Sequence, residues 1–415
     1  MKCILKVALL IILFNIQTTY SQSKNHDIVI GKNHTINSSI LKGERGFQVY
    51  LPKNYHNSEK KYPVLYILDG QLHFKNGVAI QESLQVPGAI PEMIIVGLQN
   101  NYPKRTDIKW SKKETYYSFL ADELIPYIEA TYKASKTRVL FGWEMSAFIS
   151  SYMLLNEEPL FDGVILSNGG SPTVEMVEAF KKGSNLSNYY LYMTNSKKDI
   201  YTIEYTNDLA KLLENEAPKN LKWIYKKFDN ETHETLPYLT MYYGLRYFYH
   251  NFESVNFSSF EDYEQFGGIP SLKTYFKERG ERFSFPKSID DSTKNGLIWL
   301  AWNKDNFDYF KLFMNEFKDV LSTKRYQSGY WQNRLGQMYL KHGDITSALT
   351  FFNNGINNFS DSKELAEMHF GIAQANFTLK KKKEAKKHIK TAIKIAEEKS
   401  DSNLEKYQEY LSKIS

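Results

Sequence analysis

Cysteine is nearly absent from this sequence. The chain of 415 residues contains one cysteine, Cys3, so it can form no internal disulfide and offers no cysteine pair to a metal. Cys3 also precedes the longest apolar run, whereas a lipid-modified cysteine would follow such a run, so lipidation is not expected. The fold must therefore be stabilised by its packed core.

Long apolar runs are scarce too, and the longest one lies at the N-terminus. Residues 4–14 read ILKVALLIILF, Lys2 precedes them, and the small residues of TTYSQS follow. This order predicts a signal peptide over residues 1–21, cleaved near Ser21, and a protein that is secreted or periplasmic. The alternative is an N-terminal anchor, but the run is short for a hydrocarbon layer of about 30 Å. We expect no membrane span in the mature protein.

An excess of one charge is also missing. The 53 Lys and Arg residues nearly balance the 47 Asp and Glu residues, and the net charge is only +6. Nucleic-acid binding would need a concentrated basic face, so no nucleic-acid partner is expected. The lysines at 380–383, 386, 387 and 390 form one basic cluster, but no aromatic residues are interleaved with them. We interpret this cluster as the solvated face of a terminal helical repeat, although it could also attract an acidic polymer or a membrane surface.

The motifs of common cofactor and metal sites are not found. The nine histidines do not recur at ligand spacing, and neither His-Glu-x-x-His nor a glycine-rich phosphate loop occurs. The sequence therefore predicts no metal and no cofactor.

Short apolar strands alternate with helical stretches through the first half of the chain. The strand segments are 46–52, 62–70, 92–99, 138–142, 163–169, 189–195 and 221–229. The helical segments between or after them are 116–131, 146–156, 207–216 and 236–252. Alternation of this kind predicts an α/β fold with a mainly parallel sheet and helices on both of its faces.

The pattern changes to helices alone after residue 252. In the first repeat, one helix carries Leu335, Gly336 and Tyr339, and the helix after a turn at Gly343 carries Ala348 and Phe352. In the second repeat, Leu379 precedes the turn, and Ala385, Ile389 and Ala392 follow it. This spacing is typical of tetratricopeptide repeats, in which small residues let two helices pack closely. We predict a helical connection over 253–290 and tetratricopeptide-like repeats over 291–415. The concave surface of such repeats would bind a protein or peptide partner.

Four segments resemble a family of α/β-hydrolases that includes siderophore esterases, feruloyl esterases and esterase D. They are VYLPKNYHNSEKKYPVLYILDGQLHF (49–74), RVLFGWEMSAF (138–148), LFDGVILSNGGSP (160–172) and FDNETHETLPYLTMYYGLRYFY (228–249). The resemblance covers residues 47–249, and the tail resembles the repeat extension of some bacterial members. It implies an α/β-hydrolase domain over 22–252. It also implies a hydrolase of acyl esters, whose ligand would be a small-molecule, oligosaccharide or siderophore ester. The predicted signal peptide would export this hydrolase.

The resemblance also implies a catalytic site, with a nucleophile, an acid and a histidine in that chain order. His233 falls on the position of the family's histidine. Asp199 follows the strand after which the family places its acid. Backbone N–H groups of Gly70 or Gln71 and of Met145 would form the oxyanion hole, and this part of the site does not depend on side chains.

The nucleophile position departs from the family pattern. In the frame G-x-S-x-G, the apex serine is replaced by Glu144, while small residues remain at Gly142 and Ser146, so the sharp turn itself is expected. Ser146 cannot substitute, because two positions along a helix point to a different side. Glu144 could be a carboxylate nucleophile, a structural residue beside some other catalytic group, or the mark of a non-catalytic binding protein. In the last case we expect Glu144 to form an ion pair with His233.

Overall fold

The chain divides into two compact units, Met1–Phe252 and Glu253–Ser415. The computed structural model describes residues 28–101, 104–183 and 187–414, and the predicted signal peptide lies outside them. In these ranges no helix combines the length and the apolar character needed to cross a bilayer. The two units are described separately below.

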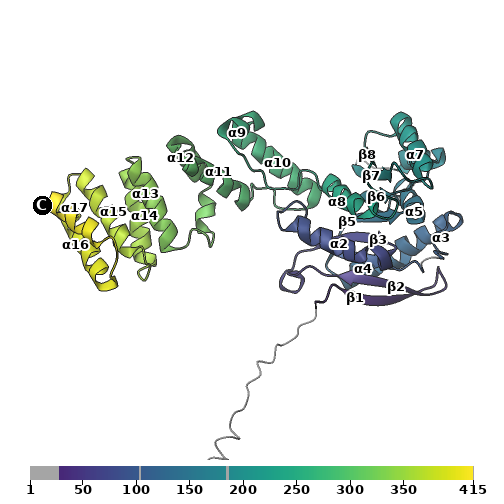
Figure 1. Ribbon diagram of the computed structural model, residues 1–415, viewed down its shortest axis with the longest axis horizontal. Coiled ribbons are helices and arrows are strands. Elements are labelled where there is room, and N and C mark those ends of the chain that lie inside the picture. The colour runs from purple at the N-terminus through teal and green to yellow at the C-terminus, as the bar shows by residue number, and fades with distance from the viewer. Residues whose placement is uncertain (1–27, 102–103, 184–186, 415) are drawn as a thin grey trace, which may run out of the picture. The chain divides into compact units, whose positions relative to one another are not determined.

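The first unit is built on one eight-stranded sheet with the order β1-β2-β4-β3-β5-β6-β7-β8 (Figure 1). The strands are β1 Lys32–Ser38, β2 Gly43–Tyr50, β3 Tyr62–Leu68, β4 Ile94–Leu98, β5 Ala134–Trp143, β6 Gly163–Ser167, β7 Tyr189–Ser196 and β8 Leu221–Phe228. β1 and β2 are antiparallel to their neighbours, and the pairs from β4 to β8 are parallel. The predicted α/β-hydrolase class is therefore confirmed.

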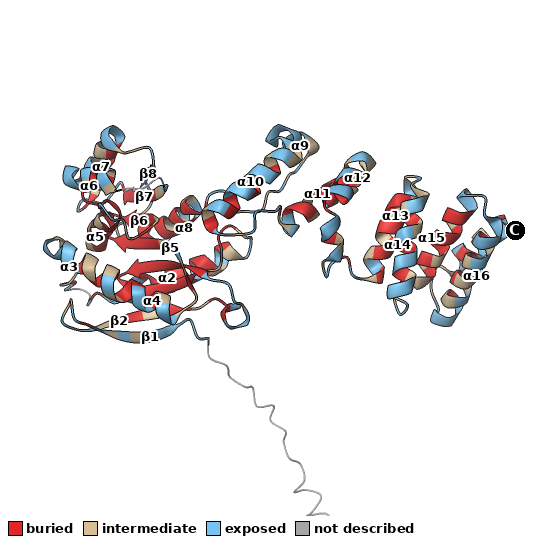
Figure 2. Ribbon diagram, turned by 180° about the vertical axis from the view of Figure 1, so that it is seen from behind, coloured by how far each residue is buried: buried red, intermediate tan, exposed pale blue. Residues whose placement is uncertain are grey.

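Helices cover both faces of the sheet, which explains why the central strands are apolar throughout. Every residue of β3, β4 and β6 is buried, as expected for parallel strands between two helical layers. Figure 2 shows buried residues concentrated in the middle of the sheet, while β1 at its edge is largely exposed or intermediate. The helices of this unit are α2 Gly70–Gln85, α3 Lys113–Ser118, α4 Ile125–Thr131, α5 Met145–Leu154, α6 Val174–Gly183, α7 Ile203–Glu216 and α8 Leu236–Phe248. Shorter turns are η1 Tyr55–Asn57, η2 Trp110–Lys112 and the π-helical η3 Phe119–Leu124.

Each strand segment expected from the sequence overlaps one of the strands β2 to β8, although the expected segment 62–70 runs into the start of α2 at Gly70. β1 was not expected. Its sequence, KNHTINS, is polar, and most of its residues are exposed or half-buried. An edge strand needs only one neighbour and one covered face, so it leaves little apolar signal. The expected helix over 116–131 is observed as α3, η3 and α4 in succession.

The second unit is helical throughout its described residues. Its elements are α9 Phe260–Phe266, α10 Gly268–Phe283, α11 Asp291–Asn303, α12 Phe307–Glu316, η4 Lys318–Ser322, α13 Gly329–Lys341, α14 Ile345–Asn358, α15 Leu365–Thr378, α16 Lys382–Lys399 and α17 Leu404–Ile414. Three pairs of consecutive helices follow one another: α11–α12, α13–α14 and α15–α16 (Figure 1). Within each pair the two helices pack against one another. The segment 253–290, expected as a connection, contains α9 and α10.

Small residues let one aromatic ring enter between three of these helices. A Cβ atom at Gly336 of α13 would lie 2.5 Å from the ring of Phe352 on α14. A Cβ atom at Gly371 of α15 would overlap the same ring. Phe352 is fully buried, so α13, α14 and α15 share this one side chain as part of their core.

Candidate active site

The elbow between β5 and α5 has the strained geometry that the sequence predicts. Glu144 has φ 53° and ψ −118°, a conformation that side-chain-bearing residues rarely adopt. Its backbone N–H donates to the carbonyl of Ser167 on the neighbouring strand at 3.0 Å. A side chain at Gly142 would overlap Ser146 and Ser150, so glycine is required there. The chain therefore keeps the turn that presents an apex side chain, here a glutamate.

A second sharp turn lies beside the elbow, between β3 and α2. Asp69 has φ 56°, and Gly70 begins α2 so close to β4 that an added Cβ would lie 2.5 Å from the carbonyl carbon of Gly97. Gly70 and Gln71 open α2, and Met145 opens α5. The first N–H groups of a helix have no acceptor within it, so these backbones suit the expected oxyanion role.

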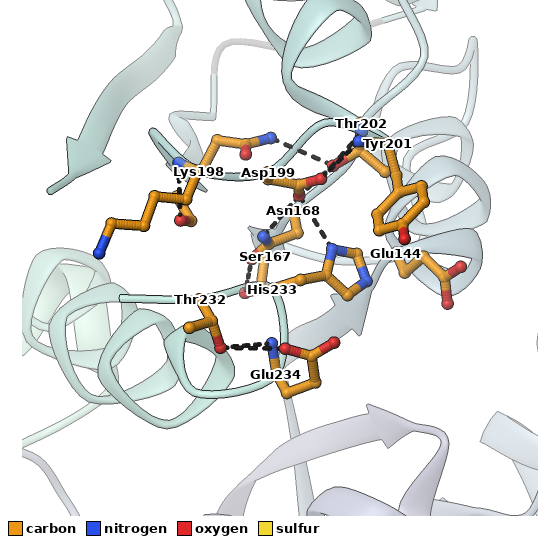
Figure 3. Close-up of polar contacts among 12 residues, drawn as sticks. Glu144, Ser167, Asn168, Lys198, Asp199, Tyr201, Thr202, Thr232, His233 and Glu234 are labelled. Carbon is orange, nitrogen blue, oxygen red and sulfur yellow. Dashed lines mark hydrogen bonds and ion pairs between the residues drawn. The ribbon is translucent and has the colours of Figure 1, made fainter. Parts of the chain in front are cut away.

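His233 and Asp199 lie against one another, although 34 residues separate them. His233 lies between β8 and α8, and Asp199 follows β7. The imidazole Nδ1 is 2.9 Å from Asp199 Oδ2, and the two side chains are 11% and 0% exposed. The indole of Trp143 donates to the carbonyl of His233 at 3.0 Å and fixes this loop on the elbow. The imidazole turns its Nδ1 edge to Asp199, and Glu144 lies on the side of the opposite edge (Figure 3).

Asp199 is held as a carboxylate by a ring of donors. The side chains of Asn168 and Thr202 each donate to Oδ2 at 2.7 Å, and the backbone N–H of Tyr201 donates to Oδ1 at 2.8 Å. Burial alone would raise the pKa of Asp199, but the hydrogen bonds from Asn168, His233 and Thr202 outweigh it and lower the pKa to about 2. The ionised carboxylate fixes the orientation of the imidazole ring.

Glu144 does not pair with His233, contrary to the expectation for a non-catalytic member. Its Oε2 pairs with Nη1 of Arg105, whose side chain is only 3% exposed. The Arg105 Nε lies 3.2 Å from Asp69 Oδ1, and the guanidinium stacks 5.0 Å from the ring centroid of Trp143. Across the described chain, no hydrogen bond or ion pair joins Glu144 to His233. A guanidinium is always charged, so it competes for the carboxylate better than an imidazole does.

Asp69 is the second carboxylate in this group and is fully buried. Burial raises its pKa, while Arg105 and the side chains of Ser146, Gln71 and Asn100 lower it by smaller amounts. Ser146 donates its hydroxyl to Asp69 Oδ2 at 2.9 Å and accepts from the N–H of Trp143 at 2.9 Å. This hydroxyl is buried in the structure of the turn, so Ser146 cannot replace the missing serine.

Three polar residues of the site were not identified from the sequence: Asp69, Arg105 and Asn168. Each follows the carboxyl end of a strand, β3, β4 and β6 respectively. Ligand sites of α/β sheets lie at this edge, so strand order together with the polar residues after each strand could have indicated them. Within the described ranges, no three His, Cys, Asp or Glu side chains are arranged to hold a metal ion.

Comparisons with known proteins bear on the family and on the fold of the first unit. A family model described as "Putative esterase" matches residues 38–267, more than half of the chain. Among solved structures, an IroE-like serine hydrolase from Shewanella oneidensis has a TM-score of 0.53 at 20% identity, over 69% of this chain and 98% of that one. An uncharacterised protein from Capnocytophaga ochracea DSM 7271 has a TM-score of 0.60 at 16% identity, over 79% and 94%. At these identities the likeness shows the fold alone.

A curated relative matches a shorter region. The uncharacterized protein YbbA of Bacillus subtilis (strain 168) is 26% identical in an alignment of 145 residues that covers 31% of this chain. The match covers 58% of YbbA, less than two thirds of its length. Because the family model covers most of the first unit, with its elbow and its histidine loop, the chain belongs to the putative esterase family.

Proposed function

We propose that this protein is an exported, non-catalytic member of the esterase family that binds a ligand in the former ester pocket. The observation that carries the proposal is the ion pair between Glu144 and Arg105. The apex side chain has neither a hydroxyl nor a thiol, so it cannot form the acyl-enzyme of a serine hydrolase.

The ion pair also argues against Glu144 as a replacement nucleophile. Arg105 pairs with Oε2 of Glu144, and a carboxylate whose charge a guanidinium neutralises is a weaker nucleophile toward a carbonyl carbon. Glutamate is one methylene longer than the aspartate nucleophiles of other hydrolases, and catalysis is sensitive to displacements of about 1 Å. Both facts support binding in place of cleavage.

The ligand class follows from family membership and from the groups that remain. Asp199 orients the imidazole of His233 through its Nδ1 atom, which leaves the Nε2 atom on the opposite edge to hydrogen-bond a polar atom of a ligand. We propose an ester of a small molecule, an oligosaccharide or a siderophore, or the acid derived from it, as the ligand. In this proposal the second unit consists of tetratricopeptide-like repeats that bind a protein partner.

Ester hydrolysis is the second candidate, and the strained elbow favours it. The backbone of Glu144 costs about 1–3 kcal/mol, a strain that active sites commonly retain. In this alternative, Glu144 attacks an ester carbonyl to form a mixed acid anhydride, and the alkoxide leaves with a proton from His233. Water then hydrolyses the anhydride, which releases the acid and restores the Glu144 carboxylate.

The test is the release of p-nitrophenolate from p-nitrophenyl acetate by wild type, Glu144→Ser and Glu144→Gln. We expect no turnover by wild type or Glu144→Gln above the uncatalysed rate. Glu144→Ser should gain activity, because it restores a hydroxyl on the strained turn beside His233. The turnover rate of the double variant Glu144→Ser/His233→Ala should be about 100-fold lower than that of Glu144→Ser, because a general base commonly contributes a factor of this size.

Two results would overturn the proposal. Wild-type turnover that Glu144→Gln abolishes would establish Glu144 in the chemistry. Wild-type turnover that survives Glu144→Gln and depends on His233 would establish a different nucleophile.

A further inference from the structure

An arginine of the second unit is surrounded by four aromatic rings. The guanidinium carbon of Arg334 on α13 lies 5.1–5.7 Å from the ring centroids of Trp302, Trp331, Tyr330 and Trp299. Its Nη1 also donates to the hydroxyl of Tyr330 at 2.6 Å. The rings come from α11 and α13, which follow one another as first helices of consecutive pairs. We call these five residues, together with Arg325, the arginine cluster.

The arginine cluster exposes large apolar rings to solvent. Trp299 is 40% exposed and Tyr330 is 46% exposed, while the remaining rings are half-buried. Trp, Tyr and Arg are the residue types that most often dominate binding energy in protein interfaces. The composition and the exposure together indicate a surface for a partner.

The cluster also carries positive charge that the described residues do not neutralise. Arg325 stacks 4.9 Å from the centroid of Trp331, so two guanidinium groups lie against the same indole ring. In the part of the chain that the structure describes, neither Arg325 nor Arg334 forms an ion pair with an acidic side chain. An anionic group from outside would therefore relieve the repulsion between two cations.

Stacking decides from which direction such an anion can approach. The ring centroids of Trp302 and Tyr330 lie 5.1 and 5.4 Å from the guanidinium carbon of Arg334. Its N–H donors lie in the plane of the group, and Nη1 already donates to the hydroxyl of Tyr330. A carboxylate accepts two parallel N–H bonds in that plane. Because the rings already restrict the side chain, little conformational entropy remains to be lost when the carboxylate binds.

We propose that the arginine cluster docks an acidic peptide segment of a partner protein. Side-chain carboxylates of the segment pair with Arg334 and Arg325, and an adjacent apolar side chain covers Trp299 and Tyr330. This inference rests on the proposed partner role of the second unit, and it is independent of ester binding at Glu144.

The test measures the fluorescence anisotropy of a labelled, C-terminally amidated peptide with several glutamates and one phenylalanine, added to the full chain at low ionic strength. A peptide with glutamine at each glutamate is the matched probe. Wild type should bind the acidic peptide, and Arg334→Gln should weaken it by about tenfold or more. Arg334→Lys should weaken it too, because lysine lacks the planar fork.

A control variant separates the cluster from general positive charge. Lys311→Gln removes a cation that stacks 5.0 Å from Phe307 outside the cluster, and it should leave binding unchanged. Trp299→Ala keeps both arginines and should still weaken binding of the acidic peptide. This variant tests the cluster even if the Arg334 variants fail to fold. Absence of binding by wild type, equal binding of the glutamine peptide, or equal losses in Lys311→Gln and Arg334→Gln would each overturn the docking site. None of these results would bear on the ester assay.

Discussion

At the scale of single residues, one cation stabilises two carboxylates at the base of the candidate site. Arg105 contacts both the buried Asp69 and the half-exposed Glu144. The serine hydrolases of the family need a hydroxyl where Glu144 lies. Arg105 therefore supplies a counter-charge to the glutamate at this position as well as to Asp69.

Removing the cation should destabilise the first unit. Arg105→Gln leaves Asp69 buried without its cation, and breaking a buried pair by deleting one partner costs about 3–5 kcal/mol. The free energy of unfolding from urea titration is the measurement. Asp69→Asn should offset part of the loss when combined with Arg105→Gln. Equal stabilities of the single and double variants would contradict a role for Asp69 in the effect.

At the scale of elements, two histidines lie between α15 and α16. The Nδ1 atoms of His369 and His388 are 3.0 Å apart. Burial, together with the charge of His388, lowers the pKa of His369 to about 4. Burial, together with the charge of Lys387, lowers the pKa of His388. Both imidazoles therefore stay neutral in the folded protein, and one ring can donate its N–H to the other.

This contact should make the α15–α16 pair sensitive to acid. The unfolded histidines titrate near pH 6.5, above the folded values, so the unfolded state binds more protons as pH falls. The stabilisation is complete above pH 6.5 and is lost as pH falls toward 4. Hydrogen exchange of α15 and α16, corrected for intrinsic rates, should accelerate between pH 7 and pH 5. The increase should be smaller in His388→Gln, and exchange in α13 and α14 of the same sample serves as the reference.

At the scale of the whole molecule, the first residues of the second unit are tied to that unit. Ser254 donates to Asp290 at 2.8 Å, and Val255 donates to the hydroxyl of Thr293 at 2.9 Å. Tyr275 donates to the carbonyl of Glu253 at 2.8 Å. The segment that was expected to connect two domains is thus part of the helical unit.

Separate fragments should therefore fold when the chain is divided after Phe252. We expect fragments 28–252 and 253–415 to show cooperative thermal transitions, since each unit has its own hydrophobic core. Circular dichroism measures the transitions. A second fragment that starts at residue 291 lacks the contacts of Ser254 and Tyr275 and should melt at a lower temperature. Aggregation of both long fragments would contradict this division.

The sequence predicted the sheet better than it predicted the site. Buried parallel strands such as β3 leave continuous apolar runs, so their positions are readable without a structure. Asp199 and His233 were located from the resemblance, and the structure brings them together. The predicted ion pair between Glu144 and His233 was wrong, because Glu144 pairs with Arg105. Arg105 lies in an irregular loop 39 residues earlier in the chain, and no sequence periodicity there indicates which side chains point inward.

The ring of Phe352 has a consequence for how the second unit unfolds. Because this ring fills the space above both Gly336 and Gly371, none of α13, α14 and α15 can separate without opening a cavity in the other two. The three helices should therefore behave as one cooperative block, in contrast to a chain of repeats that fray one by one from the end. A force that a bound partner exerts on Arg334 of α13 would then be shared by α14 and α15. Phe352, which lies outside the arginine cluster, would in this way make the docking surface harder to unfold by force.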